Sequence, residues 1–148
     1  MEIQIVDIPT TARLSLHIPE FEAPYGEDVY YQRLSGKNHL LLAASIDGLL
    51  VGFKTGYESD EPTHFYSWMG GVLPEYRKLG FATALAAYQE KWVIEQGYSH
   101  ILMKTRNQNR NMLLFCLARG FQITAVRPAE TLAEHRIYLQ KELKKADP

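Results

Sequence analysis

The sequence predicts a mixed α/β sandwich built around a single sheet, and three observations predict it. The chain has 148 residues, a length at which one domain buries a sizeable core. Apolar runs bounded by turn residues alternate with segments of helical periodicity, in the order strands, helix, strand, helix, strands. No internal repeat, low-complexity stretch or Pro/Ser-rich linker divides the chain. We therefore expect one domain over residues 1–148.

The first half of the chain is expected to hold strands and two helices. Asp47-Gly48 is the pair favoured in a tight type I′ hairpin, so the apolar runs on either side of it should pair. With the next apolar run they should form an antiparallel meander. Pro9 and Pro74 end strands, and a loop punctuated by Pro and Gly separates the two helices. The expected strands are 3–8, 39–46, 49–57 and 64–72, and the expected helices are 10–18 and one with its core at 30–34.

The second half should begin with a long helix. Its apolar residues repeat at helical intervals, and Gly97 suits the position just after its C-terminus. The repeating residues are Phe81, Leu85, Tyr88 and Trp92. The expected helices are 81–96 and 109–119, and the expected strands are 98–105, 121–126 and 135–139.

Composition excludes several classes of protein. No run of eighteen apolar residues is present, so a membrane span is not expected, and the amino terminus lacks the basic start and long apolar stretch of a signal peptide. Cys116 is the only cysteine, so no internal disulfide can form, which fits a reducing cytoplasm. The five histidines show no paired ligand spacing, so no metal site is expected.

The net charge of −1 hides an asymmetry between the two halves. Residues 1–62 carry ten acidic and four basic residues, whereas residues 63–148 carry seven acidic and twelve basic residues. Either both halves simply present solvated charges, or the second half meets an anion and the first half a cation. The basic residues form no dense Lys/Arg tract, so nucleic acid is not an expected partner.

One segment between an expected strand and the long helix suits a bound anion. Backbone N–H groups are unpaired at a helix N-terminus, and the helix dipole also favours negative charge there. Gly80 lets the backbone approach a ligand closely. The segment lacks the Gly-Lys-Ser/Thr of a Walker loop and the second glycine of a Rossmann fingerprint, so it is either a different phosphate site or a plain helix start with a turn glycine. It reads Arg77-Lys78-Leu79-Gly80-Phe81-Ala82-Thr83.

In its context this segment resembles the signature of the GNAT acetyltransferase superfamily. From Gly70 to Ala82 the chain shows a strand ending near Val-x-Pro, then Arg-x-x-Gly-x-Ala and a long helix. A second family element follows, with Asn109, Met112 and Gly120-Phe121 at the expected spacing. The resemblance covers essentially the whole chain. It implies the GNAT fold, an α/β (α+β) arrangement with a mixed, mostly antiparallel sheet of six or seven strands flanked by about four helices. It also implies acetyl-CoA or a related acyl-CoA as donor and usually an amine acceptor.

The resemblance also assigns roles on the donor side. Gly70 lies where a strand N–H faces the thioester carbonyl, and Val72 where the chain holds the pantetheine arm. The strands carrying Gly70 and Ile101 are expected to splay apart to admit that arm. Asn109 would help to hold it, or would cap the following helix, or both. The backbone N–H groups expected at the diphosphate are those of Leu79, Gly80, Phe81, Ala82 and Thr83, with Arg77 and Lys78 adding charge.

The proton-transfer groups depart from the family pattern. Tyr66 occupies the position where some family members have a basic Glu, so it is expected to position a water instead. Glu58, Glu22 or His64 would then collect the proton of the amine, unless each is only a surface residue. Cys116 stands where many members have a Tyr that protonates the leaving thiolate. It is a weak donor, a buried structural residue or, least expected, a nucleophile.

The acceptor side is expected to be acidic and aromatic. Alternation along 64–72 puts Tyr66 and Trp68 on one face, where they could line an acceptor pocket, and Phe65 and Met69 on the other. The surrounding acids favour a cationic acceptor, either a small molecule or a peptide amine. The opposing hypothesis is a non-catalytic acyl-CoA-binding regulatory module. The closing strands, 121–141, are a candidate edge for a homodimer. The acids are Glu20, Glu22, Glu27, Asp28, Glu58, Asp60 and Glu61.

Overall fold

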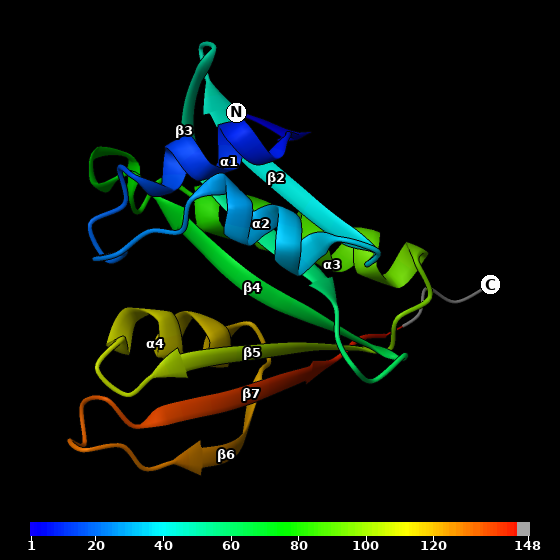
Figure 1. The fold of residues 1–148 in the computed structure, drawn as a ribbon, viewed down its shortest axis with the longest axis vertical. Helices are drawn as coiled ribbons and strands as arrows, with labels where there is room; N and C mark the ends of the chain where they lie inside the picture. The colour runs from blue at the N-terminus through cyan, green and yellow to red at the C-terminus, as the bar shows by residue number, and fades with distance from the viewer. Residues whose placement is uncertain (145–148) are drawn as a thin grey trace. The chain divides into compact units, whose positions relative to one another are not determined.

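The computed structural model describes residues 1–144, and its strands join in one mixed sheet in the order β1-β2-β3-β4-β5-β7-β6 (Figure 1). The predicted α/β class is therefore confirmed. The strands are β1 (Glu2–Ile5), β2 (His39–Ile46), β3 (Leu49–Glu58), β4 (His64–Val72), β5 (His100–Arg106), β6 (Gln122–Arg127) and β7 (Arg136–Glu142). The helices are α1 (Ile8–Ser15), α2 (Glu27–Leu34), α3 (Phe81–Glu95) and α4 (Arg110–Ala118), with a 3₁₀ turn, η1 (Pro74–Tyr76), that the sequence did not predict.

The chain divides into two compact units. Unit 1 comprises Met1–Glu58 and Ser67–Trp92, and unit 2 comprises Ser59–Tyr66 with the chain from Val93 onward. Strand β4 thus contributes its first residues to unit 2 and its remaining residues to unit 1.

Unit 1 contains the predicted antiparallel meander. Strand β2 pairs antiparallel with β1 and with β3. The turn between β2 and β3 has positive φ at Asp47 (51°) and Gly48 (80°), as the type I′ hairpin requires. The N–H of Leu73 donates to the carbonyl of Val51 at 2.8 Å, while Thr55 contacts Met69 earlier in β4, so β3 and β4 also run antiparallel.

The first helix begins earlier than the sequence suggested. Residues 6–8 were expected to continue the first strand, but α1 begins at Ile8. Asp7 is the N-cap and accepts a hydrogen bond from the N–H of Thr10 at 2.9 Å. Pro9 therefore stands in the first turn of a helix, where its missing N–H costs nothing, rather than closing a strand.

Two layers of helix enclose the strands of unit 1. Helices α1 and α2 cover one face, and α3 covers the other (Figure 1). On the first face, Leu14 and Ile18 pack with Ala43 and Phe53. On the second face, α3 buries Phe81, Leu85, Ala86 and Gln89, whereas Tyr88, expected in that stripe, is 36% exposed. The buried side of α3 therefore repeats every four residues from Phe81 through Leu85 to Gln89, so its third position is a glutamine.

Unit 2 is built on β5 and β7. Strand β5 pairs in parallel with His64–Tyr66 of β4 and antiparallel with β7, and β7 pairs antiparallel with β6. Strand β5 begins at His100, two residues later than expected. Strand β6 ends the sheet order, and each of its six residues is exposed.

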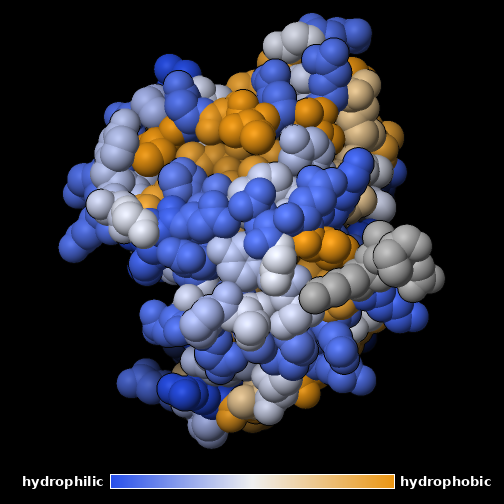
Figure 2. All heavy atoms as spheres, turned by 90° about the vertical axis from the view of Figure 1, so that its right-hand side faces the viewer, coloured by the Kyte–Doolittle hydropathy of each residue, from blue (hydrophilic) through white to orange (hydrophobic). Residues whose placement is uncertain are grey.

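The surface drawn in Figure 2 is hydrophilic over most of its area, with hydrophobic side chains gathered toward its upper part. Within residues 1–144, no helix is long and apolar enough to cross a membrane.

Candidate active site

The loop before α3 ends in Gly80, and Ala82 and Thr83 in the first turn of the helix are exposed. Gly80 has φ of 93°, a conformation that favours glycine, and Lys78 also has positive φ, 64°. The first helical hydrogen bond runs from the N–H of Ala84 to the carbonyl of Gly80 at 3.0 Å. Glycine has no side chain to cap the helix, so several N–H groups have no partner within it. These are the N–H groups of Phe81, Ala82 and Thr83.

The side chain of Arg77 binds within the protein. Its Nη2 lies 2.6 Å from Oε2 of Glu20, and its Nε donates to the carbonyl of Val72 at 3.0 Å. The hydrogen bond from Arg77 lowers the pKa of Glu20. Arg77 thus ties the end of β4 to the segment after α1, and its charge is already balanced by a carboxylate. Lys78, which is exposed, is the other cation of this loop.

Strand β4 changes its alternation just before Gly70. The ring of Trp68 lies 5.2 Å from that of Tyr30 in α2, and Met69 packs against the cluster containing Leu14 of α1. Trp68 and Met69 are neighbours that face the same layer of helices, so the expectation that Met69 shares a face with Phe65 is wrong. A regular strand alternates its side chains, so β4 contains a bulge at this point.

Gly70 and Val72 follow this bulge. A Cβ on Gly70 would lie 3.2 Å from the carbonyl oxygen of Phe53, so the two backbones approach closely at this position. Val72 is 8% exposed, with its carbonyl bound by Arg77.

Trp68 lies in an aromatic cluster that includes a cation of the protein itself. Its ring lies 5.7 Å from the rings of both Tyr25 and Tyr57. The guanidinium carbon of Arg33 lies 4.6 Å from the centre of Trp68 and 5.7 Å from that of Tyr25. Burial raises the pKa of Tyr30, which keeps this hydroxyl protonated. One face of Trp68 is therefore occupied by Arg33, a contact of the kind that stabilises arginine on indole.

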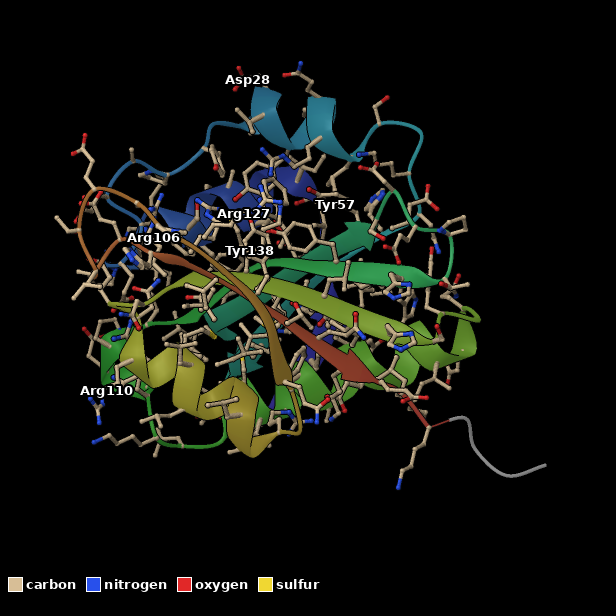
Figure 3. All side chains as sticks on the ribbon, turned by 90° about the horizontal axis from the view of Figure 1, so that it is seen from below. Asp28, Tyr57, Arg106, Arg110, Arg127 and Tyr138 are labelled. Carbon is tan, nitrogen blue, oxygen red and sulfur yellow. The ribbon has the colours of Figure 1, made fainter. Side chains whose placement is uncertain are left out.

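In unit 2, Tyr66 is half-buried beside a lysine. The ammonium of Lys104 lies 5.1 Å from the ring centre of Tyr66 and 5.8 Å from that of Tyr138. The guanidinium of Arg127 also lies over Tyr138, at 5.2 Å (Figure 3). This cluster of rings and cations is basic.

Cys116 is buried among other sulfur atoms. It is 1% exposed, and its Sγ lies 3.4 Å from Sδ of Met103 and 3.8 Å from Sδ of Met112. This environment favours a structural role for the thiol, because burial among apolar groups disfavours the thiolate that acts as a nucleophile.

Asn109 precedes α4 but does not cap it with its side chain. It occupies the N-cap position, and its Nδ2 donates instead to Oγ1 of Thr105 at 3.1 Å. The expected capping hydrogen bond is therefore absent at this residue.

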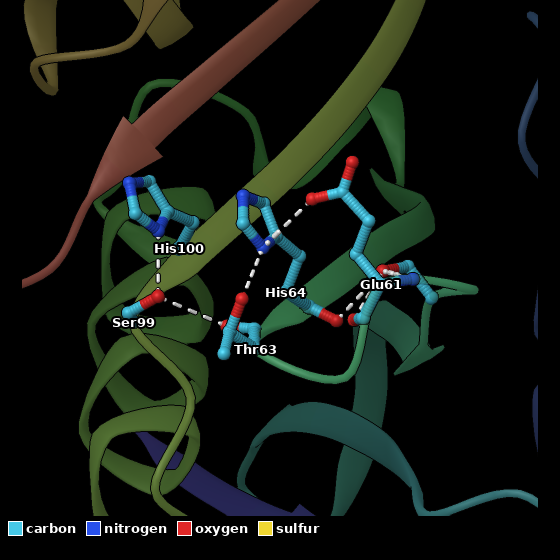
Figure 4. Close-up of polar contacts among 6 residues, drawn as sticks. Glu61, Thr63, His64, Ser99 and His100 are labelled. Carbon is cyan, nitrogen blue, oxygen red and sulfur yellow. Dashed lines mark hydrogen bonds and ion pairs between the residues drawn. The ribbon is translucent and has the colours of Figure 1, made fainter.

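His64 is part of a polar cluster at the start of β4 and β5. Its ring stacks on that of His100 with centres 4.4 Å apart and 5° between the planes. Its Nδ1 lies 3.1 Å from Oε2 of Glu61 and 2.8 Å from Oγ1 of Thr63, while Nδ1 of His100 lies 2.6 Å from Oγ of Ser99 (Figure 4). These contacts hold the two strand ends together.

The remaining candidates lie in unit 1. Glu22 is exposed, and Glu58 is half-buried at the end of β3. No group of three or more His, Cys, Asp or Glu residues that could hold a metal ion occurs in the described part of the chain.

Sequence reasoning missed two residues of these clusters. Arg33 gave no signal, because an arginine in a short helix is ordinary. Thr55 is a polar residue in a mostly apolar predicted strand, and this was the only sequence signal for its contact with Met69.

The fold is a mixed sheet whose strand β4 leads through a loop into the long helix α3, and comparison with known proteins names the family that has it. The chain belongs to the acetyltransferase (GNAT) family, whose model matches residues 10–121. An acetyltransferase of Yersinia pestis (strain Pestoides F) and one of Yersinia pseudotuberculosis are each 33% identical over 79 residues. That match covers 53% of this chain and 54% of each relative, so the chain spans about half the length of the curated relatives it matches.

Solved structures share the fold at low identity. The ribosomal-protein-S18-alanine N-acetyltransferase of Escherichia coli has a TM-score of 0.81 at 16% identity, covering 99% of this chain and 96% of that one. An aminoglycoside 6′-acetyltransferase type Ii has a TM-score of 0.79 at 22% identity, covering 99% and 100%. The yncA protein of Salmonella typhimurium, solved with acetyl-CoA, has a TM-score of 0.76 at 14% identity, covering 99% and 96%.

Proposed function

We propose that this protein transfers an acetyl group from acetyl-CoA to a primary amine, by direct attack of the amine on the thioester in a ternary complex. The observation that carries the proposal is the N-terminus of α3, which directly follows Gly80 with its positive φ, in a chain of the GNAT family. The N–H groups of residues 79–83 would bind the CoA diphosphate, with Lys78 adding positive charge. Arg77 would act mainly by holding the loop, because Glu20 and the carbonyl of Val72 occupy its guanidinium.

Two further groups are proposed for the rest of acetyl-CoA. The N–H of Gly70 would donate to the thioester carbonyl, whose oxygen gains negative charge as the amine attacks. The backbone at Val72 and the amide of Asn109 would hold the pantetheine arm. Asn109 already donates to Thr105 through Nδ2, which leaves its side-chain oxygen available as an acceptor.

The acceptor is proposed to be cationic, either a small molecule or a peptide. Support comes from the exposed acids Glu22, Glu27 and Asp28, which lie in one segment with Tyr25 of the Trp68 cluster. A cationic acceptor would be attracted to these carboxylates rather than to the face of Trp68 that Arg33 covers. The fold neighbours include an aminoglycoside acetyltransferase and an acetyltransferase of a ribosomal protein, which supports both kinds of amine.

Proton transfer is proposed to involve water. An alkylammonium with a pKa near about 10 must lose its proton before attack, and Tyr66 is a poor base at neutral pH. Tyr66 would position a water, with Glu58, Glu22 or His64 collecting the proton. The leaving thiolate needs no dedicated acid, because thiols ionise near about pH 8.5, and Cys116 is proposed to serve packing alone.

An assay of CoA thiol release from acetyl-CoA, across a panel of cationic, neutral and anionic amines, tests the proposal. Release that depends on the amine, with cationic acceptors preferred, is expected. Tight CoA binding without release by any amine would instead favour the second candidate, a non-catalytic acyl-CoA-binding regulatory module, which the replacements at Tyr66 and Cys116 motivate.

A homodimer through β6 is also proposed. The strand ends the sheet order, and Ile123 and Val126 on it are each 50% exposed. An unpaired edge of this kind is suited to pairing with a second copy. Sedimentation equilibrium that gives a monomer mass at all concentrations would contradict it.

A further inference from the structure

Thr55 of β3 holds both polar backbone groups of one residue in β4. Its Oγ1 accepts a hydrogen bond from the N–H of Met69 at 3.1 Å and lies 3.3 Å from the carbonyl oxygen of Met69, to which it donates. A hydroxyl has one donor and two acceptor lone pairs, so it can do both at once. The side chain of Thr55 is fully buried. It therefore binds the backbone of β4 with a side chain at the bulge.

The bulge explains why a side chain is needed there. Trp68 and Met69 are consecutive residues, yet both face the layer of α1 and α2. The buried positions of β4 also change from the odd-numbered Phe65 and Ser67 to the even-numbered Val72, as the insertion of one extra residue requires. A bulge leaves its extra residue outside the regular ladder of backbone hydrogen bonds. Without Thr55, the N–H and carbonyl of Met69 would be left without these partners.

The contact also fixes the direction of the Gly70 N–H. The carbonyl of Met69 and the N–H of Gly70 belong to one planar peptide unit, and the structure has no cis peptide bond in residues 1–144. In a trans peptide these two groups point in opposite directions. Because the carbonyl of Met69 points to Thr55, the N–H of Gly70 points away from the Thr55 hydroxyl. Among the described residues, the register between β4 and β5 covers His64–Tyr66 and does not include Gly70.

We propose that Thr55 is a positioning residue for acetyl transfer, whose hydroxyl fixes the β4 bulge and so aims the Gly70 N–H at the thioester carbonyl. The proposal rests on the proposed function, in which Gly70 is the donor to that carbonyl. Thr55 does not touch the substrate and acts through the Met69–Gly70 peptide.

Three variants separate positioning from stability. Thr55→Val keeps the shape and removes the hydroxyl, and Thr55→Ser keeps the hydroxyl. Thr11→Val is the matched control, because Thr11 is also fully buried and its Oγ1 donates to a backbone carbonyl, that of Asp7, at 3.0 Å in another part of unit 1. We expect Thr55→Val to lower kcat by about ten- to a hundredfold, part of the loss seen when an oxyanion donor is removed. KM for acetyl-CoA should change little, Thr55→Ser should recover most of kcat, and Thr11→Val should lower the melting temperature without this loss of kcat.

Two CoA analogues provide a readout that a merely structural role would not change. One is a ketone with a methylene in place of the thioester sulfur, and the other is S-ethyl-CoA, which lacks the carbonyl. The wild type should bind the ketone at least about fivefold more tightly, as one added hydrogen bond predicts. Thr55→Val should lose this preference while retaining its affinity for CoA. In the wild type, the NMR signal of the Gly70 N–H should shift with the ketone and not with S-ethyl-CoA, while the Met69 N–H stays protected from exchange.

Each outcome is decisive. A wild type that prefers the ketone and a Thr55→Val variant that keeps the same preference would overturn the role of Thr55 alone. A wild type that binds both analogues equally would overturn the assignment of Gly70, and the inference with it. If Thr55→Val does not fold, the wild-type NMR signals decide, because rapid exchange of the Met69 N–H or an unmoved Gly70 signal would overturn the inference.

Discussion

A single added charge at Gly80 should weaken CoA binding, and the size of this loss of affinity follows from the local geometry. No heavy atom lies within 4 Å of a Cβ built on Gly80, so a side chain there meets open space. Two effects remain. One is the strain of φ at 93°, which costs a non-glycine residue about 1–2 kcal/mol. The other is repulsion between an added carboxylate and the diphosphate, which is about 1 kcal/mol per charge at about 4 Å in water.

Gly80→Asp and Gly80→Asn separate the two effects, because the side chains have the same size and both tolerate positive φ better than most. Two phosphate charges give about 2 kcal/mol, so Gly80→Asp should bind CoA about 30-fold more weakly than Gly80→Asn. Gly36→Asp is the control for stability, since Gly36 also has positive φ, 71°, and open space around its Cβ. It should lower the free energy of unfolding by a similar amount and leave CoA affinity unchanged.

Isothermal titration calorimetry with CoA at low ionic strength measures these affinities, and thermal unfolding measures stability. Equal CoA affinity for Gly80→Asp and Gly80→Asn would refute the diphosphate site. A loss of affinity in Gly36→Asp as large as that in Gly80→Asp would show that the effect comes from stability and not from local charge.

Three further predictions follow from the other contacts. Glu20→Gln should lower the free energy of unfolding by less than about 1 kcal/mol, because the Glu20 side chain is 55% exposed. Since the hydrogen bond from Arg77 lowers the pKa of Glu20 in the folded state, this contribution is present above the unfolded pKa of about 4.3 and is lost as pH falls through the folded value. Denaturation curves of the two proteins should thus converge in acid, and a difference that persists there would contradict the ion pair. Arg33→Gln should lower KM for cationic amines about two- to fivefold, because it removes a repulsion between two positive charges of about 1 kcal/mol. KM for neutral amines should not change. Cys116→Ala should retain kcat within about twofold. Cys116→Ser should lower the free energy of unfolding by about 1–3 kcal/mol, because it buries a hydroxyl. A large fall in kcat of Cys116→Ala with unchanged stability would instead indicate a chemical role for the thiol.

The fold was readable from the sequence where local rules act alone. The hairpin at Asp47-Gly48 needs positive φ at two residues, and few pairs other than this one satisfy that requirement. The strand over 39–46 was predicted to the residue, because the hairpin turn at Asp47-Gly48 fixes where it ends. The start of α1 was misjudged because Pro9 is compatible with both a strand end and a first helical turn. Only the cap by Asp7 distinguishes the two.

The site divides in the same way. The sequence by itself predicted the loop before α3, because a glycine at a helix start leaves backbone N–H groups without partners inside the helix, and this is the local geometry on which the proposed anion site rests. Tertiary structure decided which partners the charged side chains near this loop contact and to which face of the sheet the side chains of β4 point. It placed Arg77 on Glu20, which is 57 residues away in the chain, and it placed Arg33 on Trp68. It also introduced the bulge that turned Met69 to the face of Trp68 and bound it to Thr55. Periodicity assumes an unbroken strand, and the place of one extra residue depends on tertiary contacts of β4 with Thr55 and with the helix layer, which no local pattern contains.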